Sequence, residues 1–314
     1  MKLSIVTSLY RSAEFLPEFY RRARAAALAL TPDYEFVLVD DGSPDASFAV
    51  AAALREADDR VTVVQLSRNF GQHKAMMTGL SHATGDLVLL LDCDLEEEPE
   101  WVLDFYADMR ESGADVVYGV QEARKGGLWE RVSGGLFYRV LGRLSNVLVP
   151  PNQTTCRLMT RDYVAALVAH REREVFMAGL WAATGFRQVP RTVRKLSRGD
   201  SGYTLRKKLA MAVDSLTSFS TAPLRGIFGV GVVILLLSVC VAAVAVGYSL
   251  FGAVLPGWTS VVVSIWFLGG LILFAQGVTA IYLGKVLSEV KQRPYTVVRS
   301  VLAGRAAESG RRAA

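Results

Sequence analysis

Two aspartates separated by a single residue are the strongest chemical signal in the sequence. Asp92 and Asp94 stand at the end of residues 85–94, which contain the most apolar of several short segments. Two carboxylates at positions i and i+2 after a buried strand can bind one divalent cation, which can hold a diphosphate and neutralise a phosphate leaving group. We therefore predict a metal or diphosphate site here.

Helix capping is the alternative reading of acidic residues in this region, since negative side chains stabilise a helix N-terminus. We predict capping for the glutamates that surround Pro99, which are Glu97, Glu98 and Glu100.

A pair of adjacent aspartates closes another apolar segment. Asp40 and Asp41 end one predicted strand and begin the sequence Asp-Asp-Gly-Ser-Pro. Their carboxylates could accept hydrogen bonds from a ribose or a base, but Asp-Gly-Ser-Pro is equally typical of a turn and a helix cap. From these residues alone both interpretations stay open.

Apolar, β-branched segments alternate with segments of helical periodicity over the first part of the chain. The predicted strands are residues 3–8, 35–40, 61–66, 86–92 and 115–118, and the predicted helices are residues 14–30, 44–57, 72–83 and 99–111. This alternation predicts an α/β fold with a mostly parallel sheet. Ligands bind beyond the carboxyl ends of such strands. The residues at these ends are Ser8, Tyr10, Asp40, Asp41, residues 67–69, Asp92 and Asp94.

Motifs of other functional classes are missing from the sequence. No GxGxxG follows the first predicted strand and no GxxxxGK[ST] occurs, which disfavours dehydrogenases and P-loop proteins. The three cysteines lie far apart without zinc-type spacing, so neither disulfides nor zinc are expected. His82 and His170 fit structural roles, whereas His73 lies near the predicted strand ends and its role stays open.

A long uncharged stretch follows the α/β part of the chain. Residues 226–284 contain no Asp, Glu, Lys, Arg or His, although 21% of the chain is charged. A turn signal at residues 252–257 divides the stretch into residues 226–251 and 258–284, each long enough to cross a bilayer. Lys and Arg flank the pair but are absent from the turn, so both termini are expected in the cytoplasm. Membrane-flanking cations partly explain the net charge of +5, and nucleic acid is not needed as a partner.

Five segments in a fixed order resemble one enzyme family. They are VLVDDGSPD (37–45), LSRNFGQHKAMMTGL (66–80), GDLVLLLDCDLEEEPE (85–100), CRLMTRDYV (156–164) and EVKQRPY (289–295). The set resembles the inverting polyprenyl-phosphate glycosyltransferases of family 2, with bactoprenol glucosyltransferases and dolichol-phosphate mannose synthases as relatives. The resemblance implies a GT-A nucleotide-diphospho-sugar transferase domain with a Rossmann-like, mostly parallel sheet, followed by a two-helix transmembrane hairpin.

The expected organisation has four parts. A cytosolic GT-A catalytic domain covers residues 1–204, and a juxtamembrane interfacial helix covers residues 205–224. Two transmembrane helices occupy residues 225–285, and a cytosolic C-terminal tail covers residues 286–314. This organisation predicts a multi-pass protein of the cytoplasmic (inner) membrane.

The resemblance also assigns site residues. It implies that Mg²⁺ or Mn²⁺ and the donor diphosphate bind at Asp92 and Asp94, with Glu96 at a position that is commonly Gln. Arg157 matches the Arg of the family's FRL segment and is expected to be catalytic with the two aspartates. The expected nucleotide-sugar-binding residues are Ser8, Tyr10, Asp40, Asp41, Arg68 and Arg198. The expected acceptor-phosphate-binding residues are Arg124, Lys125 and Arg131.

The implied reaction transfers one sugar from a nucleotide diphosphate sugar, with UDP the expected nucleotide, to polyprenyl (undecaprenyl) phosphate, for cell-envelope glycan modification or glycosylation. A separate flippase would then move the product, and the oligomeric state, a homo-oligomer included, stays open. A processive synthase is disfavoured because no QxxRW occurs. Three alternatives remain: a nucleotide-binding protein without turnover, a glycosyltransferase with another lipid or glycan acceptor, and a lipid-linked phosphotransferase.

Overall fold

A computed structural model describes residues 1–121, 150, 152–173, 175–195, 224, 226–234, 236–237, 240–241 and 257–303 of the chain. These residues fall into two compact units. The first contains the described residues up to 195 together with residues 293–303. The second contains the described residues from 224 to 292.

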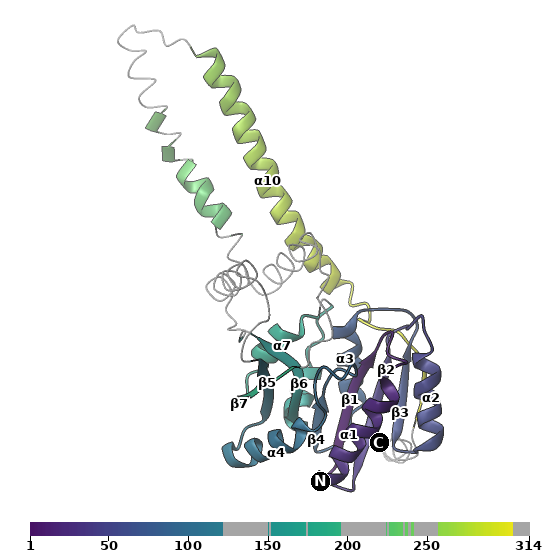
Figure 1. Cartoon of the computed structure of the whole chain (residues 1–314). Coiled ribbons are helices and arrows are strands. Elements are labelled where there is room, and N and C mark those ends of the chain that lie inside the picture. The colour runs from purple at the N-terminus through teal and green to yellow at the C-terminus, as the bar shows by residue number, and fades with distance from the viewer. Residues whose placement is uncertain are drawn as a thin grey trace. The chain divides into compact units, whose positions relative to one another are not determined.

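An eight-stranded sheet forms the centre of the first unit (Figure 1). Its strand order is β7-β5-β6-β4-β1-β2-β3-β8. The strands are β1 (Leu3–Leu9), β2 (Tyr34–Asp40), β3 (Val61–Leu66), β4 (Leu87–Leu90), β5 (Val116–Gln121), β6 (Gln153–Thr160), β7 (Gln188–Val193) and β8 (Val298–Leu302). The central run of β4, β1, β2 and β3 is parallel throughout, whereas β6 and β8 are antiparallel to their neighbours in this run. β5 pairs antiparallel with β6 and parallel with β7.

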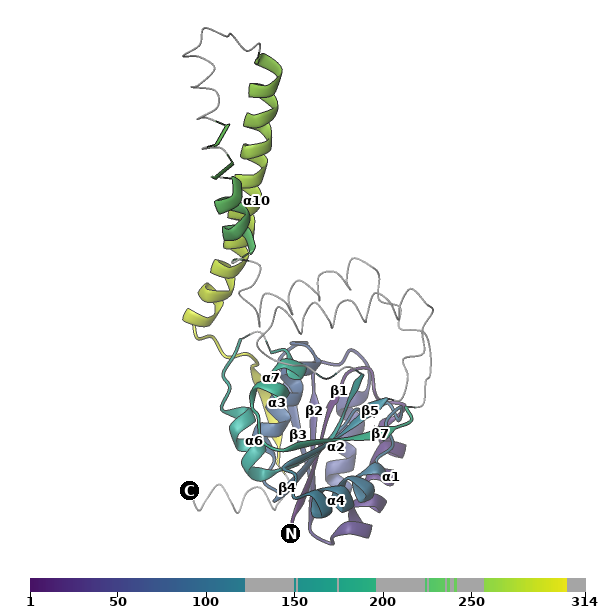
Figure 2. The same cartoon turned by 90° about the vertical axis from the view of Figure 1, so that its left-hand side faces the viewer.

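Helices cover both faces of the sheet (Figures 1 and 2). Buried residues of α1 (Leu16–Leu30), α2 (Ser47–Ala57) and α4 (Trp101–Ser112) pack in one hydrophobic cluster. Buried residues of α3 (Gln72–His82), α6 (Arg161–Val168) and α7 (Met177–Ala183) pack in the other. Each strand of the parallel run contributes alternate side chains to the two clusters, which explains its nearly continuous apolar sequence.

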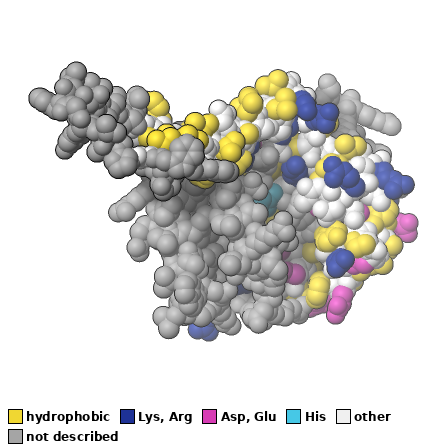
Figure 3. All heavy atoms as spheres, turned by 90° about the horizontal axis from the view of Figure 1, so that it is seen from above, with side chains coloured by type: hydrophobic (Ala, Val, Ile, Leu, Met, Phe, Trp, Pro, Cys, Tyr) yellow, Lys and Arg dark blue, Asp and Glu magenta, His cyan; other side chains and the backbone are white. Residues whose placement is uncertain are grey.

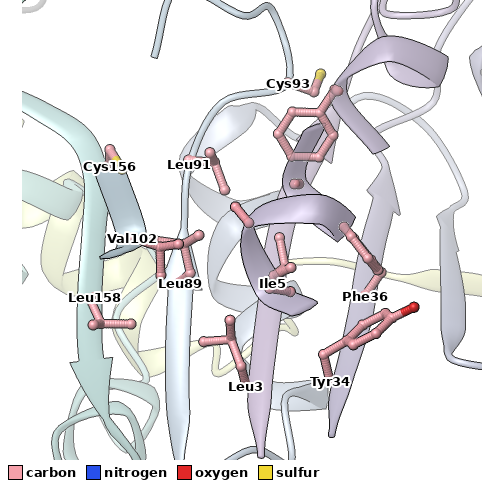
Figure 4. Packing of buried hydrophobic residues seen from close by; sticks show 14 of the residues in the cluster. Leu3, Ile5, Tyr34, Phe36, Leu89, Leu91, Cys93, Val102, Cys156 and Leu158 are labelled. Carbon is pink, nitrogen blue, oxygen red and sulfur yellow. The ribbon is translucent and has the colours of Figure 1, made fainter. Parts of the chain in front are cut away.

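The larger cluster shows this alternation in side-chain detail (Figure 4). Leu3 and Ile5 of β1 lie on the same face as Phe36 of β2 and Leu89 of β4, whereas Val6 of β1 belongs to the opposite cluster. Burying apolar surface on both faces contributes roughly 25 cal/mol per Å², so the central strands are the most strongly held part of the sheet.

The predicted strands and helices of residues 1–121 are all present, with small differences at their ends. α2 begins at Ser47 and α4 at Trp101, so Pro44 and Pro99 precede these helices instead of occupying their first turns as predicted. β4 ends at Leu90, which places Asp92 just beyond the strand. The predicted α/β fold with a mostly parallel central sheet is confirmed.

β8 was not predicted from the sequence. It lies within residues 286–314, which were expected to form a C-terminal tail. It pairs antiparallel with β3, with Val64 opposite Val301. The Arg55 side chain donates to the Ala303 carbonyl at 3.0 and 3.3 Å, and the Ser300 hydroxyl donates to Gln65 at 3.0 Å. The C-terminal segment therefore closes the β3 edge of the sheet.

The second unit contains α10 (Trp258–Val290), a helix of 33 residues. Its segment Phe267–Val290 is long and apolar enough to cross a membrane, and it is the one such segment found among the described residues. The helix contains the second predicted span, residues 258–284, and continues past it. Of the first predicted span, residues 226–251, only part is described, so the two-helix hairpin is not confirmed. The predicted interfacial helix, residues 205–224, lies almost wholly outside the described residues.

Deleting β8 tests the edge pairing. A chain that ends after Val297 should expose the β3 edge, so the amides of β3 should exchange hydrogen faster and the melting temperature should fall. Each lost hydrogen bond contributes about 0.5–1.5 kcal/mol. Mass-spectrometric hydrogen exchange on residues 61–66 measures the effect.

A chain that ends after Ala303 is the matched control for this deletion, because it keeps β8 and the carbonyl that Arg55 contacts. Equal β3 protection in the two shortened chains would show that β8 does not close this edge.

Candidate active site

The carboxyl ends of β1, β2 and β4 converge at one edge of the sheet. In the parallel register Ser8 stands beside Val39 and Leu9 beside Asp40, while Val6 stands beside Leu90. Past the strand ends, the Leu91 amide donates to the Val6 carbonyl at 3.2 Å and the Asp41 amide to the Leu9 carbonyl at 3.0 Å. The segments that carry Ser8, Asp40 and Asp92 are therefore brought together as predicted.

Asp92 and Asp94 lie in the turn after β4. The Gln72 side chain, from the start of α3, donates to Asp92 Oδ1 at 2.8 Å, and Asp94 Oδ1 accepts the Glu96 amide at 2.9 Å. Leu95, which lies between Asp94 and Glu96, has a left-handed backbone with φ of 61°. Burial, followed by the charge of Asp94, raises the pKa of Asp92 to about 6. Two carboxylates whose ionised forms repel each other suit a divalent cation, which would neutralise both.

Glu96, the predicted third metal ligand, faces Lys195. Its Oε2 lies 3.2 Å from Lys195 Nζ. No group of three or more His, Cys, Asp or Glu side chains that could hold a metal ion occurs among the residues with described positions. The roles of Asp92, Asp94 and Glu96 as metal ligands therefore stay predictions.

Glu97 is a buried residue of the site, and its predicted role in helix capping is wrong. α4 begins only at Trp101, and the Glu97 side chain is 0% exposed. Its Oε1 accepts the Thr155 amide at 3.0 Å and lies 3.7 Å from Lys195 Nζ. Burial, followed by the charge of Asp92, raises the pKa of Glu97 to about 8, although Lys195 opposes the shift.

Glu100 occupies the N-cap position of α4, where its negative charge was predicted, but its side chain makes no capping hydrogen bond and instead accepts two hydrogen bonds from the Arg22 side chain.

Arg157 lies on β6 beside Leu90, the last residue of β4. Its guanidinium is fully buried and stacks on Trp181, 2.9 Å from the ring centroid. Nε and Nη2 donate to the carbonyls of Thr155 and Thr154, whereas Nη1 has no hydrogen-bond partner within the described part of the chain. Burial lowers the pKa of Arg157 to about 9. Because a buried cation is costly without an anion, this guanidinium fits a role in binding negative charge.

The predicted nucleotide-binding residues differ in their surroundings. Asp40 is buried, which raises its pKa to about 6. Tyr10 is 46% exposed, next to the Arg11 guanidinium. Arg68 is exposed and lies over the Phe70 ring at 4.2 Å. Asp41 instead uses both carboxylate oxygens to accept the amides of Phe70 and Gly71, so its structural task is to hold the loop before α3.

Four predicted site residues cannot be placed. Arg124, Lys125, Arg131 and Arg198 lie outside the described residues, so their expected contacts with phosphate stay predictions. In the view towards the carboxyl ends of the strands, several Lys and Arg side chains lie on the described surface (Figure 3).

Residue types alone did not identify Gln72, Glu97 and Lys195 as parts of the site. Cys93, Leu95 and Glu97 are alternate residues and all three are buried, a pattern that only the structure reveals. His73, left open from the sequence, lies in the first turn of α3 with Nδ1 3.2 Å from the Val175 carbonyl. Its burial lowers the pKa of the imidazole, which fits a structural role.

Comparisons with known proteins identify the family of the chain. The family model for glycosyl transferase family 2 matches residues 4–168, which is more than half of the chain. The chain belongs to glycosyl transferase family 2, and it is a glycosyltransferase.

Individual relatives cover almost the whole chain. A protein of Mycobacterium tuberculosis named as a glycosyltransferase is 50% identical over 96% of this chain and 88% of its own length. The prophage bactoprenol glucosyl transferase homolog of Escherichia coli is 33% identical over 96% of this chain and 99% of its own length. The resemblance to polyprenyl-phosphate glycosyltransferases is thereby confirmed.

Among solved structures, a mannosyltransferase from Pyrobaculum calidifontis in complex with GDP-Man and Mn²⁺ covers 92% of this chain and 86% of its own. It has a TM-score of 0.47 and 15% identity.

The buried carboxyl of Glu97 predicts a pH-dependent stability. Its pKa is raised in the folded protein, so between about pH 5 and 8 the folded state retains a proton that the unfolded state has released. Stability should therefore fall as pH rises through this range. Glu97→Gln keeps a hydrogen-bond acceptor for the Thr155 amide but removes this titration, so its advantage over the native protein should grow from pH 5 to pH 8. Thermal unfolding in EDTA measures it.

Glu98→Gln, the same substitution at a neighbouring residue, is the control. A Glu97→Gln advantage that stays constant with pH would contradict the buried, protonated Glu97.

Proposed function

We propose that the protein catalyses the inverting, metal-dependent transfer of a single sugar from a nucleotide diphosphate sugar to polyprenyl phosphate. UDP is the proposed nucleotide and undecaprenyl phosphate the proposed acceptor, at the cytoplasmic face of the membrane. The observation that carries the proposal is the pair Asp92 and Asp94 in the turn after β4, at the edge where the parallel strands end. The relatives named as bactoprenol glucosyl transferases, at 32–33% identity, support the acceptor class.

The residues of the chain support this chemistry through positioning and charge. Gln72 fixes the orientation of Asp92, so the two aspartates would hold Mg²⁺ or Mn²⁺ together with the donor diphosphate. The cation, when bound, would stabilise the negative charge on the departing nucleotide.

Arg157 would supply a fixed positive charge near the end of β4, at a site where little solvent screens it. Preorganised charge of this kind stabilises charge that develops during reaction.

The acceptor requires no dedicated general base in this proposal. A phosphate monoester has a second pKa near 6, so its oxygen is mostly ionised at neutral pH and can attack the anomeric carbon directly. As this bond forms, the bond to the nucleotide diphosphate breaks on the opposite face and the configuration inverts. Arg124, Lys125 and Arg131 remain the proposed acceptor-phosphate ligands, and Arg198 a proposed donor ligand.

The apolar helix α10 supports a membrane location for this reaction. We propose that both predicted spans cross the cytoplasmic membrane, with both termini and the catalytic domain in the cytoplasm. A lipid phosphate in the inner leaflet would then be accessible to the domain, and the product would enter cell-envelope glycan synthesis through a separate flippase.

A second candidate is a nucleotide-binding protein without turnover. The observation that favours it is Lys195, which lies 3.2 Å from Glu96 and 3.7 Å from Glu97 and so already supplies positive charge beside the two aspartates. Turnover of a donor would exclude this candidate.

Product analysis tests the proposed reaction. Purified protein in detergent, incubated with undecaprenyl phosphate, Mn²⁺ and a panel of nucleotide sugars, should yield a lipid heavier by one sugar and release nucleoside diphosphate. Asp94→Asn keeps the side-chain size but removes a charge, so the rate should fall at least a hundredfold, about 2.7 kcal/mol. Mass spectrometry of the lipid and nucleotide chromatography provide the readouts.

Asp33→Asn, at the opposite end of the sheet before β2, is the matched control and should leave the rate unchanged. Nucleotide binding without a heavier lipid for any donor would favour the second candidate. Release of nucleoside monophosphate would indicate a phosphotransferase.

Arg157→Met separates a functional role of the buried guanidinium from a structural one. Removing a buried charge relieves its desolvation cost, so the melting temperature should not fall, whereas the transfer rate should fall at least tenfold, about 1.4 kcal/mol. Arg191→Met removes a half-exposed Arg that pairs with Asp108 on the surface and should change neither quantity appreciably. A folded Arg157→Met variant with the native rate would contradict the role of Arg157.

A further inference from the structure

The loop after β1 is held by side chains from a different loop. Three consecutive amides, those of residues 11, 12 and 13, donate to side-chain oxygens of residues 43–47, which lead from β2 into the first residue of α2. The pairs are Arg11 with Ser43 Oγ at 2.8 Å, Ser12 with Ser47 Oγ at 2.8 Å, and Ala13 with Asp45 Oδ2 at 3.2 Å. An ordinary turn would satisfy its own backbone, but these three side chains bind the backbone of the neighbouring loop.

The backbone of this loop is strained and needs such support. Arg11 has φ of 56°, a left-handed conformation that costs a residue other than glycine about 1–3 kcal/mol. The Ser43 hydroxyl accepts the amide of Arg11 itself. The conformation that sets the direction of Tyr10 and Arg11 is therefore maintained from the segment after β2.

The Ser47 hydroxyl connects two of these contacts. It accepts the Ser12 amide and donates to Asp45 Oδ1 at 2.6 Å. Ser47 is completely buried, so water cannot replace these bonds and the loss of one partner leaves another unsatisfied. The three side chains act as one support.

The same segment also holds the loop on its other side. Asp41 accepts the amides of Phe70 and Gly71. Gly42 has φ of +62°, and a Cβ at this position would lie 2.5 Å from the backbone of Arg68 and Asn69. Residues 41–47 thus bind both neighbouring loops, which carry Tyr10 on one side and Arg68 on the other.

We propose that Ser43, Asp45 and Ser47 are positioning residues for nucleotide binding, which hold the Tyr10–Ala13 loop in the geometry that receives the nucleoside. The inference rests on the proposed function, because it assigns the exposed ring of Tyr10 and the buried Asp40 carboxyl to the nucleoside. None of the three positioning residues needs to touch the nucleotide itself.

Ser43→Ala tests the inference most cleanly, because Ser43 is partly exposed and its substitution opens no core cavity. Hydrogen exchange at the amides of residues 10–13 should accelerate. The Kd of UDP in saturating Mn²⁺, measured by calorimetry on the full chain, should rise about threefold to tenfold, as the loss of one hydrogen bond predicts. The donor KM should rise by the same factor, while kcat at saturating donor and the acceptor KM should stay within about twofold, since the loop acts on donor binding alone.

Two further variants keep the test specific. Ser43→Thr retains the hydroxyl and should restore exchange rates and Kd. Ser112→Ala is the matched control, because the Ser112 hydroxyl likewise accepts a backbone amide, that of Ala114, after α4, and it should change none of these quantities.

Unchanged exchange at residues 10–13 in Ser43→Ala would overturn the inference, as would faster exchange with a native Kd and donor KM. If the native protein binds no nucleoside diphosphate in a panel of UDP, GDP and CDP, the proposed function fails and the nucleotide role of the loop fails with it. If the native protein is active but Ser43→Ala does not show the expected changes in exchange, Kd and donor KM, only the positioning role is overturned.

Discussion

The parallel pairing of β1 with β2 on one side and β4 on the other is the constraint on which the site depends. It fixes Leu9 beside Asp40 and Val6 beside Leu90, so three strand ends that are distant in sequence reach one edge. The pairing is maintained by apolar burial on both faces of the sheet. A shift of the β1 register by one residue would turn each of its side chains from one hydrophobic cluster towards the other. It would also move the acidic turns apart.

Acidic side chains gather at this edge at a cost in stability. Burial is the largest cause of the raised pKa of Asp40, Asp92 and Glu97. Such carboxyls are better placed for binding a cation or a hydrogen-bonding ligand than for supporting the fold. Lys195, which follows β7, offsets part of the negative charge.

The sequence predicted the parallel half of the sheet well, because each strand there is a short apolar segment that is followed along the chain by a segment of helical periodicity. It also predicted Asp92 and Asp94 as a pair after β4, and Asp40 at the end of β2. β8 escaped prediction, since Val298–Leu302 is mostly solvent-accessible and its pairing with β3 is a contact between distant parts of the chain.

The role of Glu97 escaped prediction for a related reason. A Glu close to a Pro at a helix start suits capping by residue type, whereas its burial beside Thr155 depends on the antiparallel pairing of β6 with β4. Local sequence also gave no indication that Ser43, Asp45 and Ser47 would bind the amides of another loop. What sequence reasoning missed therefore depends on long-range contacts.

The proposed reaction depends on the binding of a divalent cation by Asp92 and Asp94 together with the nucleotide. Electron paramagnetic resonance of Mn²⁺ titrated into the detergent-purified protein, with and without UDP, tests it most directly. We expect UDP to tighten Mn²⁺ binding in the native protein, and we expect the double variant Asp92→Asn, Asp94→Asn to lose both the binding and the effect of UDP. Native Mn²⁺ affinity in the double variant would show that the two aspartates do not bind the cation.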